Sequence, residues 1–303
     1  MKIAVTGASG LIGSTLVPAL RADGHEVVRL VRRTPRTADE HRWDPQHRRV
    51  DPALLLDVDA VVNLAGTPIR PRPFTESYRR DVLTSRVDST TTISEALAAA
   101  AAADPSRRRV LVSASAVGYY GDTGDRIVEE DAPSGDDFLA RVCVQWEEAT
   151  RPASDAGVRV VTVRTGLVIG RGAMLVRILG TVFRFGLGGR MGSGRQFWPW
   201  VSLADEIGAL RFLLTAEDVA GPVNLTGPEP VRNSEFVREL ARAVRRPAVL
   251  PVPGPAIRLA LGEFGRSSVL AGQRAVPARL QAAGYRFRHG DLPSALREAL
   301  ARG

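Results

Sequence analysis

The first half of the chain alternates short apolar runs with longer segments whose apolar residues recur every three or four positions. Runs of the first kind indicate buried strands, and segments of the second kind indicate amphipathic helices. The predicted strands cover residues 3–6, 26–31, 60–64, 110–113 and 158–164, and the predicted helices cover 11–22, 75–103 and 138–150. Strands that alternate with helices are typical of a parallel sheet with helices on both faces. We therefore expect an α/β fold with a doubly wound, Rossmann-type parallel sheet.

The character of the sequence changes after Gly166. A glycine- and aromatic-rich block, FGLGGRMGSGRQFWPW, precedes the helical pattern VSLADEIGALRFLL and a short strand pattern, GPVNLTGP. A proline-rich segment, RRPAVLPVPGP, and small helices complete the chain. These shifts predict a core over residues 1–165, completed by parts of 201–226, and a smaller C-terminal lobe over 166–303.

Length and composition indicate a globular protein. With 303 residues, of which 44% are hydrophobic and 24% charged, the chain can bury a large core. No stretch approaches eighteen uninterrupted apolar residues, and MKIAVTGASG leads directly into a strand and a glycine loop, so we expect no membrane span and no signal peptide. The lone Cys143 cannot form an internal disulfide and is expected to be packed and inert. A cytoplasmic location is expected.

The formal net charge of +8 is carried almost entirely by arginine, because Lys2 is the only lysine among 41 basic residues. This excess is spread along the chain, without zinc-ligand spacing, a basic helix or an RNA-binding motif. We therefore expect neither a nucleic-acid partner nor a metal ion. Because guanidinium groups suit phosphates and carboxylates, an anionic cofactor or substrate is expected.

Three glycines separate the first predicted strand from the first predicted helix, in TGASGLIG. In a strand–turn–helix unit such glycines permit a tight turn, close approach of a pyrophosphate, and close helix–strand packing. The expected dinucleotide contacts are Gly7, Ser9, Gly10, Leu11, Ile12 and Gly13. The alternative interpretation is a turn with a structural role alone.

The end of the second strand carries RLVRRTPR, where an NAD site would place an acidic residue about twenty positions beyond the glycines. Arg32 lies nineteen residues after Gly13, and Arg33 follows it. Two guanidinium groups suit a 2′-phosphate and favour NADP(H), although they could instead belong to the general arginine excess. At the end of the strand at 60–64, Leu64, Ala65 and Gly66 are expected to lie beside the adenine and its ribose.

Several motifs resemble one family over nearly the whole chain. They include TGASGLIG, VVNLAGTPI, SASAVGYYGD, VRTGLVIG, FGLGGRMGSGRQFWPWVSLAD, GPVNLTGPEPVRNSEF and GQRAVPARLQAAGYRF. They resemble the extended short-chain dehydrogenase/reductase superfamily, in an atypical branch called the NAD(P)-dependent epimerase family with a C-terminal domain of unknown function. The resemblance implies a Rossmann core over 1–165 that binds NADP(H), and a substrate-binding lobe over 166–303. It supplies no substrate.

In that superfamily a serine, a tyrosine and a lysine in Y-x-x-x-K spacing exchange a proton with the substrate oxygen. The lysine lowers the tyrosine pKa from about 10. By resemblance Ser115 is the serine, but Phe138 and Val142 occupy the tyrosine and lysine positions. Because the only lysine is Lys2, no other alignment can restore the pair. Phe138, Val142 and Trp146 share one helical face, which is expected to form a hydrophobic wall.

Possible replacements for the missing pair are Tyr119, Tyr120 and Arg86. Tyr119 is a candidate proton donor or substrate contact, Tyr120 is expected to pack, and Arg86 can orient an anionic group. Further expected cofactor contacts are Asp81, Arg86 and Arg164, and expected substrate contacts are Tyr119, Phe138, Val142, Trp198 and Trp200. Residues 186–200 are expected at the mouth of the nicotinamide pocket.

Two other candidates are interpreted as structural. Ser202 and Asp205 have capping-box spacing at a helix start, which favours a capping role for Asp205 over a catalytic one. None of the four histidines has metal-ligand spacing or falls within the motifs described above.

Three functions remain open from the sequence. The first is an NADPH-dependent oxidoreductase acting on a small carbonyl, imine or conjugated substrate, for which an anionic group is one option. The second is a sugar-nucleotide epimerase or dehydratase, which is disfavoured because oxidation of a sugar hydroxyl requires a base. The third is a non-catalytic NADP(H)-binding regulator. The protein is expected to be a monomer, or a homodimer formed through the helices at 75–103 and 138–150.

Overall fold

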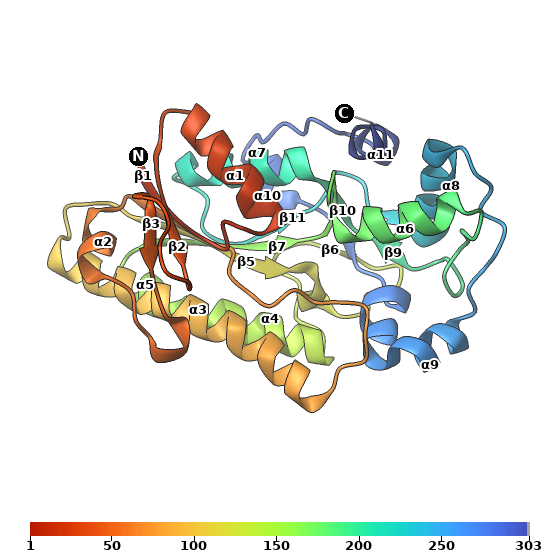
Figure 1. The fold of residues 1–303 in the computed structure, drawn as a ribbon, viewed down its shortest axis with the longest axis horizontal. Helices are drawn as coiled ribbons and strands as arrows, with labels where there is room; N and C mark the ends of the chain where they lie inside the picture. Colours follow the sequence, from red (N-terminus) through yellow and green to blue (C-terminus); the bar gives the residue numbers. More distant parts are fainter. Residues whose placement is uncertain (302–303) are drawn as a thin grey trace.

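A computed structural model describes residues 1–301 and confirms the doubly wound α/β fold (Figure 1). Its central sheet has seven parallel strands in the order β11-β7-β5-β4-β1-β2-β3. The strands are β1 (Lys2–Thr6), β2 (Glu26–Val31), β3 (Glu40–Arg42), β4 (Ala60–Asn63), β5 (Val110–Ala116), β7 (Arg159–Thr165) and β11 (Gly221–Leu225). The sequence pattern missed only β3, whose three residues are all polar and carry no apolar signal.

Helices cover both faces of this sheet (Figure 1). One face packs against α1 (Leu11–Ala22) and α7 (Leu203–Thr215), through side chains such as Leu16 and Leu210. The other face packs against α2 (Pro52–Asp57), α3 (Glu76–Ala103) and α5 (Arg151–Asp155). The neighbouring α4 (Phe138–Glu148) lies beside α3. No helix within residues 1–301 has the length and apolarity needed to cross a membrane.

The second part of the molecule has its own apolar core. The strands there are β8 (Leu167–Ile169) parallel to β10 (Trp200–Ser202), and β9 (Phe197–Trp198) antiparallel to β12 (Val231–Arg232). The helices α6 (Met174–Arg184), α8 (Asn233–Val244) and α11 (Leu292–Leu300) pack around Trp198, Trp200 and Phe236. The remaining elements are β6 (Ile127–Val128), β13 (Arg274–Ala275), α9 (Gly254–Phe264), a π-helical turn at 265–270, α10 (Ala278–Ala282) and two short 3-10 helices, Pro45–His47 and Val117–Tyr120.

Ser202 caps α7 as expected, but the Asp205 side chain does not complete the capping box and instead belongs to a larger polar cluster. Ser202 Oγ accepts a hydrogen bond from the Asp205 N–H at 2.9 Å and donates to its carboxylate at 2.6 Å. That carboxylate also accepts hydrogen bonds from the N–H groups of Arg288 and His289. His289 Nδ1 lies 2.9 Å from Ser202 Oγ. Asp205 therefore attaches the C-terminal segment to the start of α7.

Close backbone packing joins β1 to α1. A Cβ atom on Gly13 would lie 2.7 Å from the Ala8 α-carbon and would overlap the Gly7 carbonyl. Only glycine allows the helix to approach the strand this closely.

We expect Gly13→Ala to lower the free energy of unfolding by about 1–3 kcal/mol, because the added methyl group must displace backbone atoms. Urea denaturation measures this change. Gly290→Ala is the matched control, since a Cβ there would meet nothing within 4 Å, and it should be nearly neutral. Equal effects of the two substitutions would contradict the packing argument.

Candidate functional site

A cleft of about 760 Å³ opens at the carboxyl ends of β1, β2 and β4. In doubly wound sheets, ligands bind outside these strand ends. The walls come from the loop after β1, the end of β2, the segment after β4 and one side of α3. They include Gly7, Ser9, Gly10, Arg32, Arg33, Leu64, Ala65, Gly66, Asp81, Ser85 and Ser89. Nine of the fourteen predicted cofactor contacts therefore lie together around one cleft.

The glycine turn at the bottom of this cleft fits a phosphate group. Gly7 has φ +65°, and a Cβ there would lie 2.6 Å from the Leu64 carbonyl oxygen. No side chain caps the N-terminus of α1 at Gly10, so its first N–H groups are open to an anion. Leu11 and Ile12 begin α1 and pack toward the two apolar cores. As the first residues of α1, they supply backbone N–H groups at the end of the turn.

Arg32 and Arg33 differ in what they contact. Arg33 makes two hydrogen bonds to the buried Glu40, at 2.7 and 2.6 Å, and these lower the pKa of that carboxyl to about 2. Arg32 is exposed on the cleft and makes no hydrogen bond or ion pair with any residue of the described range 1–301. Of the two guanidinium groups, that of Arg32 is thus available to an anionic ligand.

Ser115 does not line this cleft, and its side chain contacts α4. Its hydroxyl is buried and donates a 2.6 Å hydrogen bond to Glu147 Oε1. Glu147 also forms paired hydrogen bonds with Arg164, each 2.8 Å long, and the Arg164 side chain is 3% exposed. Arg164 is thus neutralised inside the protein. As placed here, Ser115 positions a buried ion pair, and a catalytic role for it stays a prediction, as does cofactor contact by Arg164.

The two adjacent tyrosines differ in their surroundings. Tyr120 is buried, as expected, where its hydroxyl donates to Asn224 and accepts from Arg164, and burial raises its pKa. Tyr119 is half-buried, with the Arg164 guanidinium 3.4 Å from its ring centroid. Its hydroxyl makes no hydrogen bond to another residue of the described chain. Of the two hydroxyls, that of Tyr119 is the one free to reach a ligand.

The expected hydrophobic wall on α4 is confirmed, but it is covered. Phe138 and Val142 are buried in a cluster with Tyr78 and Val82 of α3. The Phe74 ring, from the segment before α3, lies 5.2 Å from the Phe138 ring in edge-to-face geometry. Substrate contact by Phe138 and Val142 stays a prediction, and it requires the Phe74 segment to move.

Arg86 is a buried cation without an acidic partner within residues 1–301. The residue is 9% exposed, and its Nη1 donates only to the carbonyl oxygens of Thr67 and Val82, both at 3.0 Å. Its guanidinium carbon lies 4.9 Å from the Trp146 ring centroid. Gly66, at the cleft wall, packs directly on the Arg86 side chain. A positive charge therefore lies just beneath the cleft surface.

Trp198 and Trp200 lie in the core of the second lobe. They are 4% and 1% exposed, and their Nε1 groups donate to the carbonyls of Val269 and Glu229. Neither lines the cleft described above. They hold the lobe together from within, and substrate contact by either ring stays a prediction.

Cys143 is packed, as expected: burial raises the pKa of its thiol to about 12. Within residues 1–301 no group of three or more His, Cys, Asp or Glu side chains has a geometry that could hold a metal ion.

The sequence analysis did not identify Glu40 and Glu147, the two carboxylates that pair with Arg33 and Arg164. Glu147 stands in the sequence WEE at 146–148, but its partners lie seventeen and thirty-two positions away. Glu40 is in β3, which carried no strand signal.

We expect Glu147→Gln to lower the free energy of unfolding by about 3–5 kcal/mol, because it leaves the Arg164 charge buried without its counter-ion. Denaturant unfolding measures the loss. The exposed neighbour Glu148→Gln is the control and should change stability little. Replacing both Glu147 and Arg164 by leucine should cost less than the single change, and a larger cost in the double variant would contradict the ion-pair argument.

Known protein families match most of the chain. Residues 3–226 match the NAD dependent epimerase/dehydratase family, and residues 252–299 match a domain of unknown function, DUF1731. The chain is 47% identical over 300 residues to the epimerase family protein Mb2239 of Mycobacterium bovis, covering 99% of this chain and 98% of that protein. It is 36% identical to human SDR39U1, covering 99% and 100%.

Two solved structures extend the comparison. A crystal structure of human epimerase family protein SDR39U1 with NADPH has a TM-score of 0.86 and 34% identity, covering 99% of each chain. A nucleoside-diphosphate sugar epimerase from Corynebacterium glutamicum has a TM-score of 0.81 and 35% identity, covering 99% of this chain and 58% of that one.

Proposed function

Because the chain belongs to the NAD dependent epimerase/dehydratase family, we propose that it is an NADP(H)-dependent oxidoreductase acting on a small anionic substrate. The observation that carries this proposal is the cleft at the strand ends, in which Arg32 has no acidic partner. The sequence predicts NADP(H), and the crystal structure of the human relative contains NADPH.

The residues of the cleft fit a phosphorylated dinucleotide. The pyrophosphate would lie on the turn at Gly7 and Gly10, where the first N–H groups of α1 are open. The 2′-phosphate would pair with Arg32, and Leu64 to Gly66 would lie beside the adenosine half. Asp81 lines the same cleft from α3. When bound, the nicotinamide supplies or accepts a hydride.

Arg86 supports an anionic ligand group near the reacting end. A buried charge without a counter-ion is costly, and a bound phosphate or carboxylate would neutralise it. Arg86 also brings a positive charge toward the α4 face, where the superfamily's lysine is replaced by Val142. It cannot lose its proton, so its role is to bind and orient.

Tyr119 is the residue we propose as proton donor. Its hydroxyl makes no hydrogen bond within residues 1–301, and the Arg164 guanidinium, 3.4 Å from its ring centroid, holds the ring in place. Ser115 would act indirectly, by holding Glu147 and through it Arg164 beneath that ring.

A non-catalytic NADP(H)-binding regulator is the second candidate. The observation that favours it is the Phe74 ring packed on Phe138, which fills the face where the usual pair would work. A sugar-nucleotide epimerase or dehydratase is a third candidate function, suggested by the similarity to the nucleoside-diphosphate sugar epimerase of C. glutamicum. It is disfavoured by the absence of the tyrosine–lysine pair.

We expect NADPH to bind at least about tenfold more tightly than NADH, a difference of about 1.4 kcal/mol, because Arg32 replaces the acidic residue of an NAD site. Arg32→Asp should abolish most of this preference in a fluorescence titration. Arg36→Asp makes the same charge change outside the cleft lining and should preserve it. Equal affinities of the unaltered protein for the two cofactors would rule out the assignment.

Turnover should depend on Tyr119 and Arg86 in different ways. On a panel of carbonyl and imine substrates followed by NADPH consumption, Tyr119→Phe should lower kcat by ~10²–10⁴ and leave NADPH affinity nearly unchanged. Arg86→Met should lower kcat/KM for carboxylate-bearing substrates at least about tenfold more than for their neutral amides.

Two results would decide against the oxidoreductase. If Tyr119→Phe keeps full turnover on a confirmed substrate, the proton comes from elsewhere. If NADPH binds tightly and no member of the panel is turned over, the regulator is favoured.

A further inference from the structure

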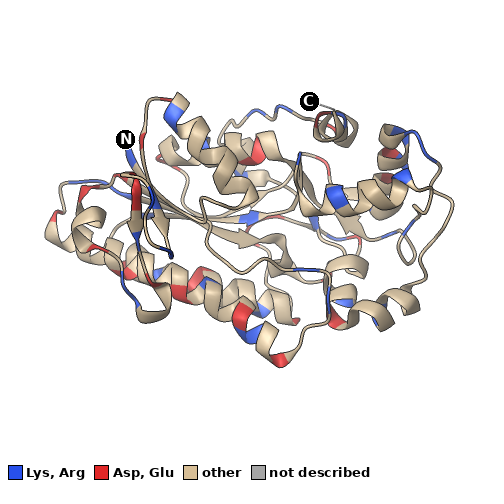
Figure 2. Ribbon diagram, viewed as in Figure 1, with Lys and Arg blue, Asp and Glu red and all other residues tan. Residues whose placement is uncertain are grey.

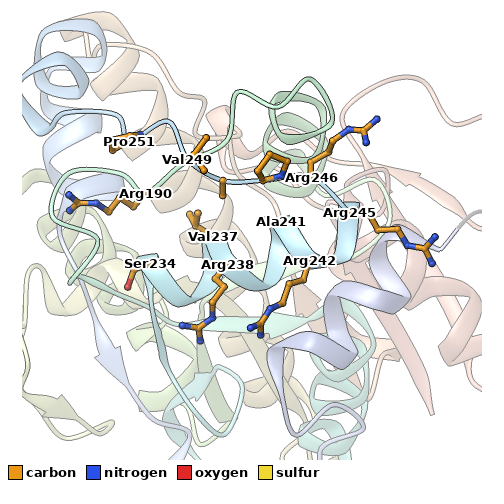
Figure 3. Close-up of a pocket in the computed structure, with 12 residues that line it drawn as sticks. Arg190, Ser234, Val237, Arg238, Ala241, Arg242, Arg245, Arg246, Val249 and Pro251 are labelled. Atoms are coloured by element: carbon orange, nitrogen blue, oxygen red, sulfur yellow. The ribbon is translucent and has the colours of Figure 1, made fainter.

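A second concave surface lies on the C-terminal lobe, away from the cofactor cleft. It is a groove of about 630 Å³ between α8 and the segment that follows it (Figure 3). The lining residues, here called the arginine groove, are Arg190, Ser234, Val237, Arg238, Ala241, Arg242, Arg245, Arg246, Pro247, Ala248, Val249 and Pro251. None of them belongs to the cleft assigned above to the dinucleotide.

Arginine is concentrated in this groove. Basic residues lie over most of the molecule (Figure 2), and 41 of 303 residues are basic. In the groove, five of twelve lining residues are arginines, roughly a threefold enrichment. The general excess of arginine therefore does not account for the local density.

The available positive charge is that of three of these arginines. Arg238 and Arg242 form ion pairs with Glu239 on the same helix. Arg190 donates to the carbonyl oxygens of Gly192 and Ser193, and Arg246 donates to that of Arg184. These two and Arg245 have no carboxylate within ion-pair distance in the described part of the chain. A net positive rim remains in solvent.

The floor of the groove is apolar. Val237 and Ala241 of α8 are 3% and 7% exposed, and the far wall carries Pro247, Ala248, Val249 and Pro251. Val249 is 70% exposed, and the adjoining Leu250 is 48% exposed. In Figure 3 the valine side chains lie in the middle of the groove, while the guanidinium groups point outward from its edges.

The far wall is held by backbone hydrogen bonds, so the groove is part of the fold. Leu250 N donates to Gly188 O at 3.1 Å, and Val252 N donates to Arg190 O at 2.9 Å. A Cβ on Gly189 would overlap the Leu250 carbonyl, so the two segments approach at a glycine.

From this combination we propose that the arginine groove binds an extended acidic segment of a partner protein. Its apolar side chains would contact Val237, Ala241 and Val249, and its carboxylates would meet the arginine rim. Arg238 to Arg245 spans about 10 Å at 1.5 Å per residue, the length of about three residues of extended peptide. If acidic and apolar residues alternate along this extended segment, its apolar side chains face the floor of the groove and its carboxylates face the arginine rim.

The groove fits other anionic partners less well. None of its lining residues is aromatic, so it offers no surface on which a nucleic-acid base could stack. It is concave, so a flat bilayer would meet the rim and leave the floor uncovered.

The probe is a fluorescein-labelled peptide of sequence Glu-Leu-Glu-Val-Glu-Leu-Asp, followed by fluorescence anisotropy with the full chain. We expect saturable binding that weakens at least tenfold when NaCl is raised from about 50 to 500 mM, as an electrostatic contact requires. Versions with glutamine in place of the acidic residues, or with serine in place of leucine and valine, should each bind at least tenfold more weakly.

The groove variant is a double substitution, Arg245→Glu and Arg246→Glu. Its matched control is a second double substitution elsewhere on the surface, Arg258→Glu and Arg297→Glu. The latter two residues are exposed and form no ion pair within residues 1–301. The groove variant should lose at least tenfold in peptide affinity, and the control should lose less than threefold. Val249→Asp should also weaken binding, and circular dichroism checks that each variant is folded.

Several outcomes would overturn the proposal: no binding of the acidic peptide, equal losses in both arginine variants, or equal binding of the glutamine peptide. Tighter binding of single-stranded DNA or of phosphatidylserine vesicles, lost in the groove variant, would assign the groove to that partner instead.

Discussion

One electrostatic constraint links the parts of this structure: a charge withdrawn from water must find a counter-charge or hydrogen-bonding partners nearby. Glu147 and Arg164 meet this requirement internally, and they fix the positions of Ser115 and Tyr119 around them. Glu40 likewise uses Arg33. Among the arginines that line or underlie the proposed cofactor cleft, Arg29 and Arg33 have acidic partners, whereas Arg32 and Arg86 have none within residues 1–301. Around this cleft, the arginines without an acidic partner are therefore the ones available to an anionic ligand.

This constraint also changes the role that we assign to the serine- and tyrosine-rich stretch at residues 113–122. Its position at the end of β5 suggested an active site with its usual partners removed. In the structure Ser115 supports an ion pair, Tyr120 is buried, and Tyr119 has its ring stacked on Arg164 and its hydroxyl without a hydrogen bond within residues 1–301. The chemistry we propose therefore rests on Tyr119 and on a cation from α3, while α4 contributes packing and, through Glu147, the ion pair that holds Arg164.

The fold was predictable because its signals are local. Apolar runs such as 110–113 and glycines such as Gly7 determine their own conformations, and of the strands of the central sheet only β3 lacked such a signal. The site was less predictable because its contacts join distant residues. No local pattern reveals that Arg33 pairs with Glu40 while Arg32 does not, or that Phe74 covers Phe138. Trp198 and Trp200 show the same limit, since their two strands pair with different partners and both rings enter the lobe core.

The central claim is that NADP(H) binds in this cleft with its 2′-phosphate on Arg32. Phosphorus NMR of NADP⁺ bound to the protein tests it directly, because a phosphate monoester has a second pKa of about 6 that a nearby guanidinium lowers. We predict that the pKa of the bound 2′-phosphate is lower than that of free NADP⁺ by at least about one unit, or about 1.4 kcal/mol. The shift should disappear in Arg32→Gln. A bound 2′-phosphate that titrates like the free cofactor would contradict the account.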